Sequence, residues 1–79
     1  MLDLTVITDT FARFGALSAE ELRITGVFPP HIGDWLTIPH PQPLTTEVIE
    51  NWARVGIPSV MVGFGAINTV FTIAELTTN

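Results

Sequence analysis

The chain contains an unbroken run of uncharged residues from Val55 to Ala74, and this run constrains the fold more than any other feature. Its apolar side chains have to be buried in the protein's own core, in a neighbouring subunit or in a lipid bilayer, because apolar surface is expelled from water. About 20 uncharged residues are enough to cross the hydrocarbon core of a membrane as a helix. The environment that buries this run therefore decides the class of function.

The pattern inside the run favours a β-hairpin over a membrane-spanning helix. Residues that disfavour a helix interrupt it, namely Pro58, Gly63, Gly65 and Asn68. Apolar side chains alternate along residues 59–64 and again along 68–76, with turn-forming residues between the two stretches. We predict a C-terminal hairpin over about 59–76. Both of its faces are apolar, so we expect part of this sheet to meet another chain. A single membrane span over 55–74 is the alternative, although no basic cluster flanks it to set an orientation.

The sequence predicts one helix, over about residues 46–55. Thr45 is suited to the N-cap, and acidic Glu47 follows in the first turn, where the helix dipole favours a negative charge. The apolar residues have helical spacing, at Val48, Ile49, Trp52 and Val55. Gly56 and Pro58 then end the helix.

The rest of the chain is less regular. Residues 2–14 fit two interpretations: Leu4, Ile7 and Phe11 have helical spacing, whereas residues 2–8 alternate and are rich in β-branched side chains. Residues 18–28 predict a short turn followed by a strand. Residues 29–43 hold most of the prolines and predict an extended arm, with a brief strand at 34–38. The predicted fold class is α+β: one small, strand-rich domain over residues 1–79 that includes this proline-rich arm.

Composition limits how such a fold can be stabilised. A domain of 79 residues buries only about 60% of its unfolded surface, so its own core is marginal. Cysteine is absent, which excludes disulfide bonds and thiolate metal sites. Association with other chains is the remaining common support for a small fold. Only 14% of the residues are charged, against about 25% in ordinary soluble domains, and this agrees with a surface covered by partners.

The charge balance excludes several classes of ligand. Eight acidic residues stand against three arginines, which gives a net charge of −5. Without a basic patch, binding to nucleic acid or to an anionic membrane surface is disfavoured. Lysine is absent; protein interfaces are depleted in lysine, and a biased genome composition explains its absence equally well. The acidic start at Met1–Asp3 lacks the basic and apolar regions of a secretory signal.

Candidate chemistry is sparse. His31, Asp34 and His40 lie in the proline-rich arm and include the residue types of a metal site or an acid–base pair. Ordinary surface loop residues are the simpler interpretation, because nothing in an irregular arm makes the three side chains converge. The adjacent pair Glu20–Glu21 suits helix capping, and the glycines at 63–66 lack the remaining residues of a phosphate-binding loop. We therefore predict no enzymatic activity, no metal and no cofactor.

The function predicted from these features is structural. We expect a non-enzymatic subunit of a larger assembly, such as a cement or connector protein of a viral particle or an accessory subunit of an intracellular complex. Its partners would be other protein subunits, in a homo- or hetero-oligomer, held through sheet edges and the proline-rich arm. The predicted interface residues are Trp35, Ile38, Pro39, Pro41, Pro43, Phe64 and Phe71. The alternatives are a single-span membrane subunit using 55–74, and a small binding module or enzyme using His31, Asp34 and His40.

Overall fold

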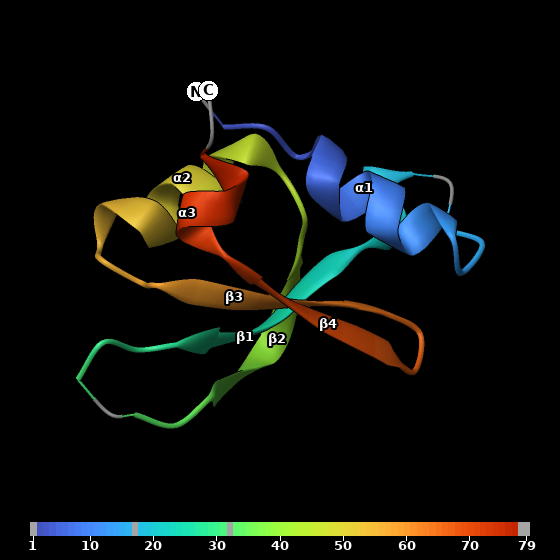
Figure 1. Ribbon diagram of the computed structural model, residues 1–79. Helices are drawn as coiled ribbons and strands as arrows, with labels where there is room; N and C mark the ends of the chain where they lie inside the picture. The colour runs from blue at the N-terminus through green and yellow to red at the C-terminus, as the bar shows by residue number, and fades with distance from the viewer. Residues whose placement is uncertain (1, 17, 32, 78–79) are drawn as a thin grey trace.

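A computed structural model describes residues 2–16, 18–31 and 33–77, which form a four-stranded antiparallel sheet with helices on one face (Figure 1). The helices are α1 (Thr5–Ala12), the 3-10 helix η1 (Ala19–Glu21), α2 (Thr46–Arg54) and α3 (Ile73–Leu76). The strands are β1 (Arg23–Phe28), β2 (Leu36–Pro43), β3 (Ser59–Phe64) and β4 (Ile67–Thr72). Their order in the sheet is β2-β1-β3-β4, so β2 and β4 are the two edges. The prediction of a small strand-rich α+β domain is confirmed.

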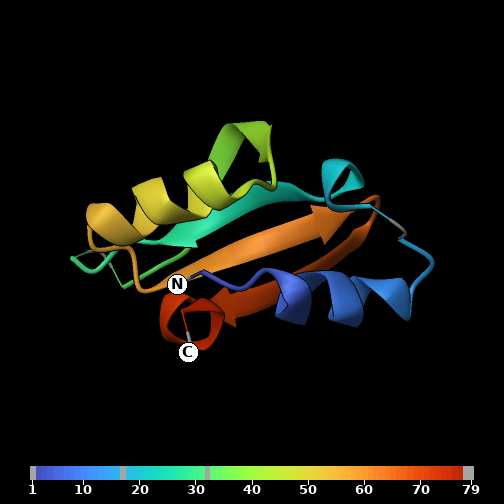
Figure 2. The same cartoon turned by 90° about the horizontal axis from the view of Figure 1, so that it is seen from above.

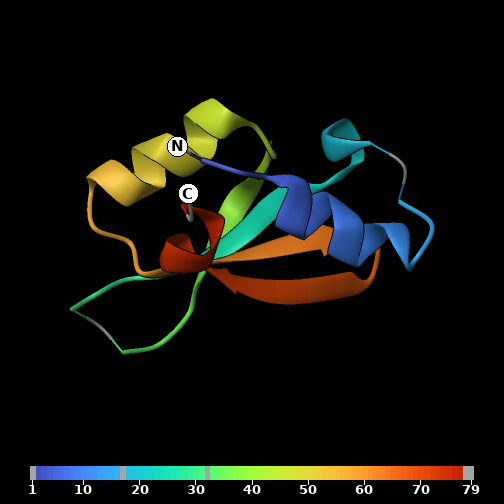
Figure 3. The same cartoon turned by 45° about the horizontal axis from the view of Figure 1, so that its top comes forward.

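The molecule has two layers. Figures 1 and 3 show α1, α2 and α3 on the same side of the sheet, and no helix of the described residues lies on the other side. Seen from above in Figure 2, α2 lies towards β1 and α1 lies towards β4. The Cα atoms extend over 34 × 30 × 17 Å, and the smallest dimension leaves room for one sheet and one layer of helices. One face of the sheet is therefore covered by this chain and the other is not.

The core lies between these two layers. Ile7 and Phe11 of α1 and Ile49 of α2 are fully buried against the sheet. The sheet contributes alternate residues that point towards the helices, among them Val60 and Val62 of β3. The buried core of the described residues consists of Ile7, Phe11, Ala16, Leu22, Ile24, Val27, Leu44, Ile49, Val60, Val62, Phe71 and Leu76. Among the described residues no charged or polar residue is buried, and the one buried side-chain polar atom without a hydrogen-bond partner is Nε1 of Trp52, whose ring packs against this core.

The predicted helix and hairpin both form. α2 begins at Thr46, after Thr45, whose hydroxyl accepts the backbone N–H of Val48 at 3.1 Å. β3 and β4 pair in one unbroken register from Ser59↔Thr72 to Phe64↔Ile67. The turn between them has Gly65 at its first central position with φ of 60°, a backbone conformation in which a side chain would be strained.

The structure decides the open alternative at residues 2–14, which adds a helix to the single one predicted, and it differs from the prediction in two further segments. Residues 5–12 adopt the helical alternative, because a helix places Ile7 and Phe11 together against the sheet. The second strand of the hairpin ends at Thr72, before α3, where a reciprocal cap between Thr72 and Glu75 starts a helix instead of continuing the strand to residue 76. Most of the proline-rich arm is β2 itself, since an edge strand tolerates proline on its outer side.

Candidate interaction surface

The uncovered face of the sheet is the most extensive candidate site. In β3, Val60 and Val62 point to the helices, so Met61 and its neighbours point away. We call this side of the sheet the open face. Strand register assigns to it Arg23, Thr25, Gly26, Phe28, Thr37, Pro43, Ser59, Met61, Gly63, Asn68, Val70 and Thr72. Its apolar side chains are those of Phe28, Pro43, Met61 and Val70, and Val70 is 47% exposed.

Two glycines make the open face flat. A Cβ atom at Gly26 would lie 3.0 Å from the Met61 side chain, and one at Gly63 would lie 2.5 Å from Oδ1 of Asn68. The larger side chains therefore lie across the glycines instead of standing upright. The Thr25 hydroxyl adds a contact to Oδ1 of Asn68 at 3.3 Å, from a bulge between Ile24 and Gly26 in β1. The result is a low surface of apolar and hydroxyl-bearing side chains.

Charge is separated between the two layers. Seven of the eight acidic residues lie in or directly before helices; they are Asp3, Asp9, Glu20, Glu21, Glu47, Glu50 and Glu75. The eighth, Asp34, lies in the loop between β1 and β2. The open face carries one charged residue, Arg23, and no acid. A protein of net charge −5 thus presents a sheet face on which negative charge is absent.

Trp35 extends the open face at the β1–β2 hairpin. Its ring packs edge-on against Phe28, with ring centroids 5.3 Å apart and the planes at 68°. Phe28 pairs with Ser59 and so lies on the open side of the sheet. Trp35 is nevertheless 39% exposed. An aromatic ring that is held by one neighbour and still exposed has the arrangement of an interface anchor.

The other predicted interface residues divide into three groups. Pro39, Pro41 and Pro43 are exposed along the outer edge strand β2. Ile38 and Phe64 are half-buried and pack against the core. Phe71 is 3% exposed, because it points to the helix layer and its ring meets that of Phe11 with centroids 6.3 Å apart. Phe71 therefore belongs to this chain's own core and is not carried into the interface proposed below.

The two edges of the sheet have opposite character. Directly after β2, the N–H of Leu44 bonds to the carbonyl of Leu22 at 3.0 Å, so the nitrogen of Pro43 points away from β1. Residues 38–41 leave the register with β1, because Gln42 pairs with Ile24 whereas Thr37 pairs with Gly26. Prolines and this excursion both hinder a further strand from pairing with β2.

β4 has none of these features. It contains no proline and no charged residue, and its register with β3 has no bulge. The two-residue turn makes Phe64 and Ile67 a hydrogen-bonded pair, and alternation then directs the N–H and C=O groups of Asn68 and Val70 away from β3. The N–H of Thr72, which has the same direction, is already bonded to the carboxylate of Glu75 at 3.2 Å.

The residues considered for chemistry do not form a site. His31, Asp34 and His40 are all exposed. In the described residues, no group of three or more His, Cys, Asp or Glu side chains is arranged to hold a metal ion. Glu20 and Glu21 lie in the short helix η1, which Ser18 caps through the N–H of Glu20.

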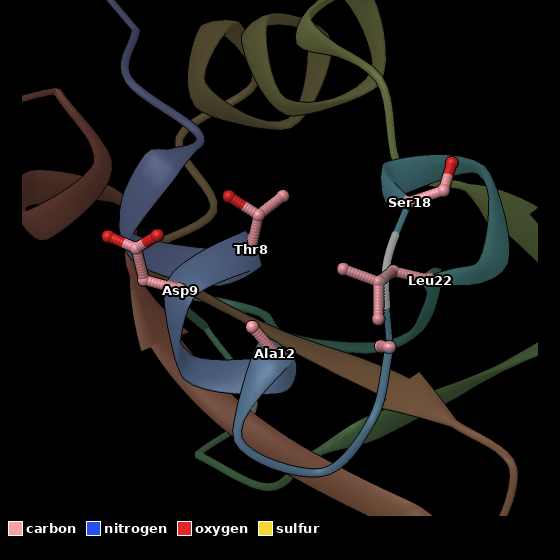
Figure 4. Close-up of a pocket in the computed structure, with 6 residues that line it drawn as sticks. Thr8, Asp9, Ala12, Ser18 and Leu22 are labelled. Atoms are coloured by element: carbon pink, nitrogen blue, oxygen red, sulfur yellow. The ribbon is translucent and has the colours of Figure 1, made fainter.

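A pocket of about 240 Å³ lies between α1 and the segment before β1 (Figure 4). Its lining residues are Thr8, Asp9, Ala12, Ala16, Ser18 and Leu22. The Thr8 hydroxyl is bonded to backbone carbonyls of its own helix, and the Ser18 oxygen accepts the N–H of Glu20. In Figure 4 the Asp9 carboxylate and the Ser18 hydroxyl point away from each other, so the pocket has no paired nucleophile and base.

A second hollow, of about 340 Å³, lies between β2 and α2 and is lined by Gln42, Glu47, Val48, Asn51 and Arg54. Most of these side chains are exposed and polar. Neither hollow therefore has the enclosed apolar lining and converging polar groups of a small-molecule site.

Comparison with known proteins gives no match: no family model, no curated protein and no solved structure is significantly similar to this chain. No helix within the described residues is long and apolar enough to cross a bilayer. The uncharged run that suggested a span instead follows α2, forms the β3–β4 hairpin and begins α3.

Proposed function

We propose that this protein is a non-enzymatic structural subunit of a larger protein assembly, and that it docks on a different protein through the open face and Trp35. The observation that carries the proposal is the uncovered side of the sheet, which holds Phe28, Met61 and Val70 and lacks acidic residues. Cement and connector proteins of viral particles and accessory subunits of large complexes are the kinds of protein that fit this description.

Charge separation supports the open face as the docking side. The acidic side chains keep the helix layer hydrated, so that side of the molecule stays exposed to water. The open face combines Phe28 and Met61 with a single arginine and no acid, and the centres of interfaces are likewise enriched in aromatic residues, methionine and arginine and depleted in charge. The partner surface that fits is therefore flat and mostly uncharged, with an apolar pocket for Trp35.

Site-specific photo-crosslinking in the cells that produce the chain tests this proposal. A photoreactive phenylalanine analogue in place of Trp35 should crosslink to one defined partner protein. The matched control is Val55, which is 61% exposed but lies at the end of α2 on the helix layer. The analogue in place of Val55 should give no such product.

With the purified partner, Trp35→Ala should weaken binding by at least about tenfold, because a desolvated tryptophan at an interface contributes about 2 kcal/mol or more. Val55→Ala should leave binding unchanged. Equal crosslinking from both positions, or a chain that remains a solitary monomer in its own cells, would overturn the proposal.

A further inference from the structure

We propose that two copies of this chain pair through their β4 edges, antiparallel and about a twofold axis, so that the two sheets become one continuous eight-stranded sheet. This inference rests on the proposed structural role but concerns a different surface, the edge of the sheet instead of its open face. The partner in this contact is a second copy of the same chain.

The first argument is the presence of unpaired backbone groups on an unprotected edge. Asn68 and Val70 direct their N–H and C=O groups outward, and no hydrogen bond within the described residues satisfies these groups. Sheet edges are usually protected by prolines, charged side chains or bulges, and β4 has none of the three. An added strand would satisfy both residues with regular β pairing.

The second argument is charge. Two copies that each carry −5 repel one another at most surfaces, but β4 contains no charged residue. Two β4 strands can therefore approach without placing acid against acid within the pairing itself. Antiparallel pairing of identical strands is self-complementary, as a twofold axis requires.

The third argument is closure. After β4 pairs with its copy, the two outer edges of the joined sheet are both β2 strands. Pro39, Pro41 and Pro43, together with the excursion over residues 38–41, hinder further addition there. The same chain thus has one edge open to pairing and one edge closed to it, and the assembly stops at two copies instead of growing into a fibre.

The register between the two β4 strands follows from which backbone N–H and C=O groups are free to pair. Centring the pair on Thr69 sets Asn68 opposite Val70 of the other copy and uses the outward N–H and C=O of both residues. A register centred on Val70 would require the N–H of Thr72, which the capping bond to Glu75 already occupies. Thr69 then faces its own copy across a non-hydrogen-bonded pair, with Cα atoms about 4.5 Å apart.

A single introduced cysteine tests the register directly, since the native chain has none. In Thr69→Cys, mild oxidation of the purified chain should yield a disulfide-linked dimer, because about 4.5 Å lies within the Cα separation of disulfides. Thr37→Cys, exposed on the β2 edge, is the matched control and should stay monomeric. Equal dimer formation by the two variants would overturn the proposed pairing.

Sedimentation velocity over a range of concentrations tests the association without any crosslink. The native chain should show a monomer–dimer equilibrium with no larger species. Val70→Pro removes one outward N–H from β4, as the prolines of β2 do at the other edge. This variant should not dimerise, while circular dichroism should show a folded monomer. A native chain that stays monomeric at all concentrations, or that forms open-ended polymers, would overturn the inference.

The two proposals fail separately. If Trp35→Ala binds the partner normally but Thr69→Cys crosslinks, the docking surface is wrong and the edge pairing stands. If Val55 and Trp35 behave as proposed but Thr69→Cys does not crosslink, the open face docks a partner and the edge pairing is wrong.

Discussion

Replacing Phe71 with alanine should bring the fold to the limit of its stability. Phe71 is 3% exposed, and its ring lies against that of Phe11, where β4 meets α1. Truncating a buried phenylalanine costs about 3–5 kcal/mol, because burial is lost and a cavity remains. Marginal stability of about 0.05–0.15 kcal/mol per residue gives a total of about 4–12 kcal/mol for 79 residues. The substitution therefore removes a large part of the total free energy of unfolding.

Urea denaturation followed by circular dichroism measures this loss. Phe71→Leu keeps most of the volume and should cost about 1.5 kcal/mol or less, which provides a measurable variant if the alanine protein does not fold. Val70→Ala is the matched control, because Val70 is the adjacent residue on the other face of the same strand and is 47% exposed. Its effect on the monomer should stay within about 0.5 kcal/mol.

The opposite result would refute the assignment of Phe71 to the core. If Phe71→Ala unfolds at the same urea concentration as the parent but associates more weakly, then its side chain contacts another chain instead of α1. A double-mutant cycle with Phe11→Leu gives an independent check, since neighbouring aromatic rings should be coupled by about 0.5–1.5 kcal/mol.

Three further changes test local features of the fold by the same denaturation assay. Thr45→Ala should cost about 1 kcal/mol, because the hydroxyl that accepts a backbone N–H at the start of α2 at 3.1 Å is lost; an unchanged stability would contradict the cap. Gly63→Ala should cost about 1–3 kcal/mol, because its Cβ would lie 2.5 Å from the side chain of Asn68, and Asn68→Ala should recover much of the loss. Hydrogen bonds from the Thr5 side chain and from its N–H lower the pKa of Asp3 below 3.8. The charged carboxylate of Asp3 is the stabilised form. Its contribution to the free energy of unfolding is therefore present above pH 3.8 and is lost as the pH falls through the lower folded-state pKa. Asp3→Asn should remove that part of the pH dependence, and an identical pH profile for the two proteins would refute it.

The sequence alone was sufficient for elements that are specified by neighbouring residues. α2 follows from a capping residue, an apolar face with helical spacing and the glycine and proline after it, and the structure places it at Thr46–Arg54. The β3–β4 hairpin follows from alternation on each side of a glycine-containing turn. The sequence also contains the signal for the start of α3, because Thr72 and Glu75 have the spacing of a capping box. The prediction nevertheless extended the strand past them.

Only the tertiary structure could decide between the two interpretations of residues 2–14. Leu4, Ile7 and Phe11 suit a helix, and the alternation along 2–8 suits a strand, so the local preferences are nearly balanced. The sheet provides a flat apolar surface on which the helix buries both Ile7 and Phe11 completely, and that burial selects the helix. The same holds for β2, because its prolines are compatible with a strand only at an edge, and strand order is a property of the whole sheet.

The candidate interaction surface shows the same division between sequence and structure. The sequence alone indicated that the hairpin is apolar on both faces, and it marked Trp35 as a possible anchor. It could not show which face the helices would cover, and it placed Phe71 in the interface although Phe71 packs under α1. Alternation separates the two faces of a strand, but only the packing of distant segments determines which face is buried and which meets a partner.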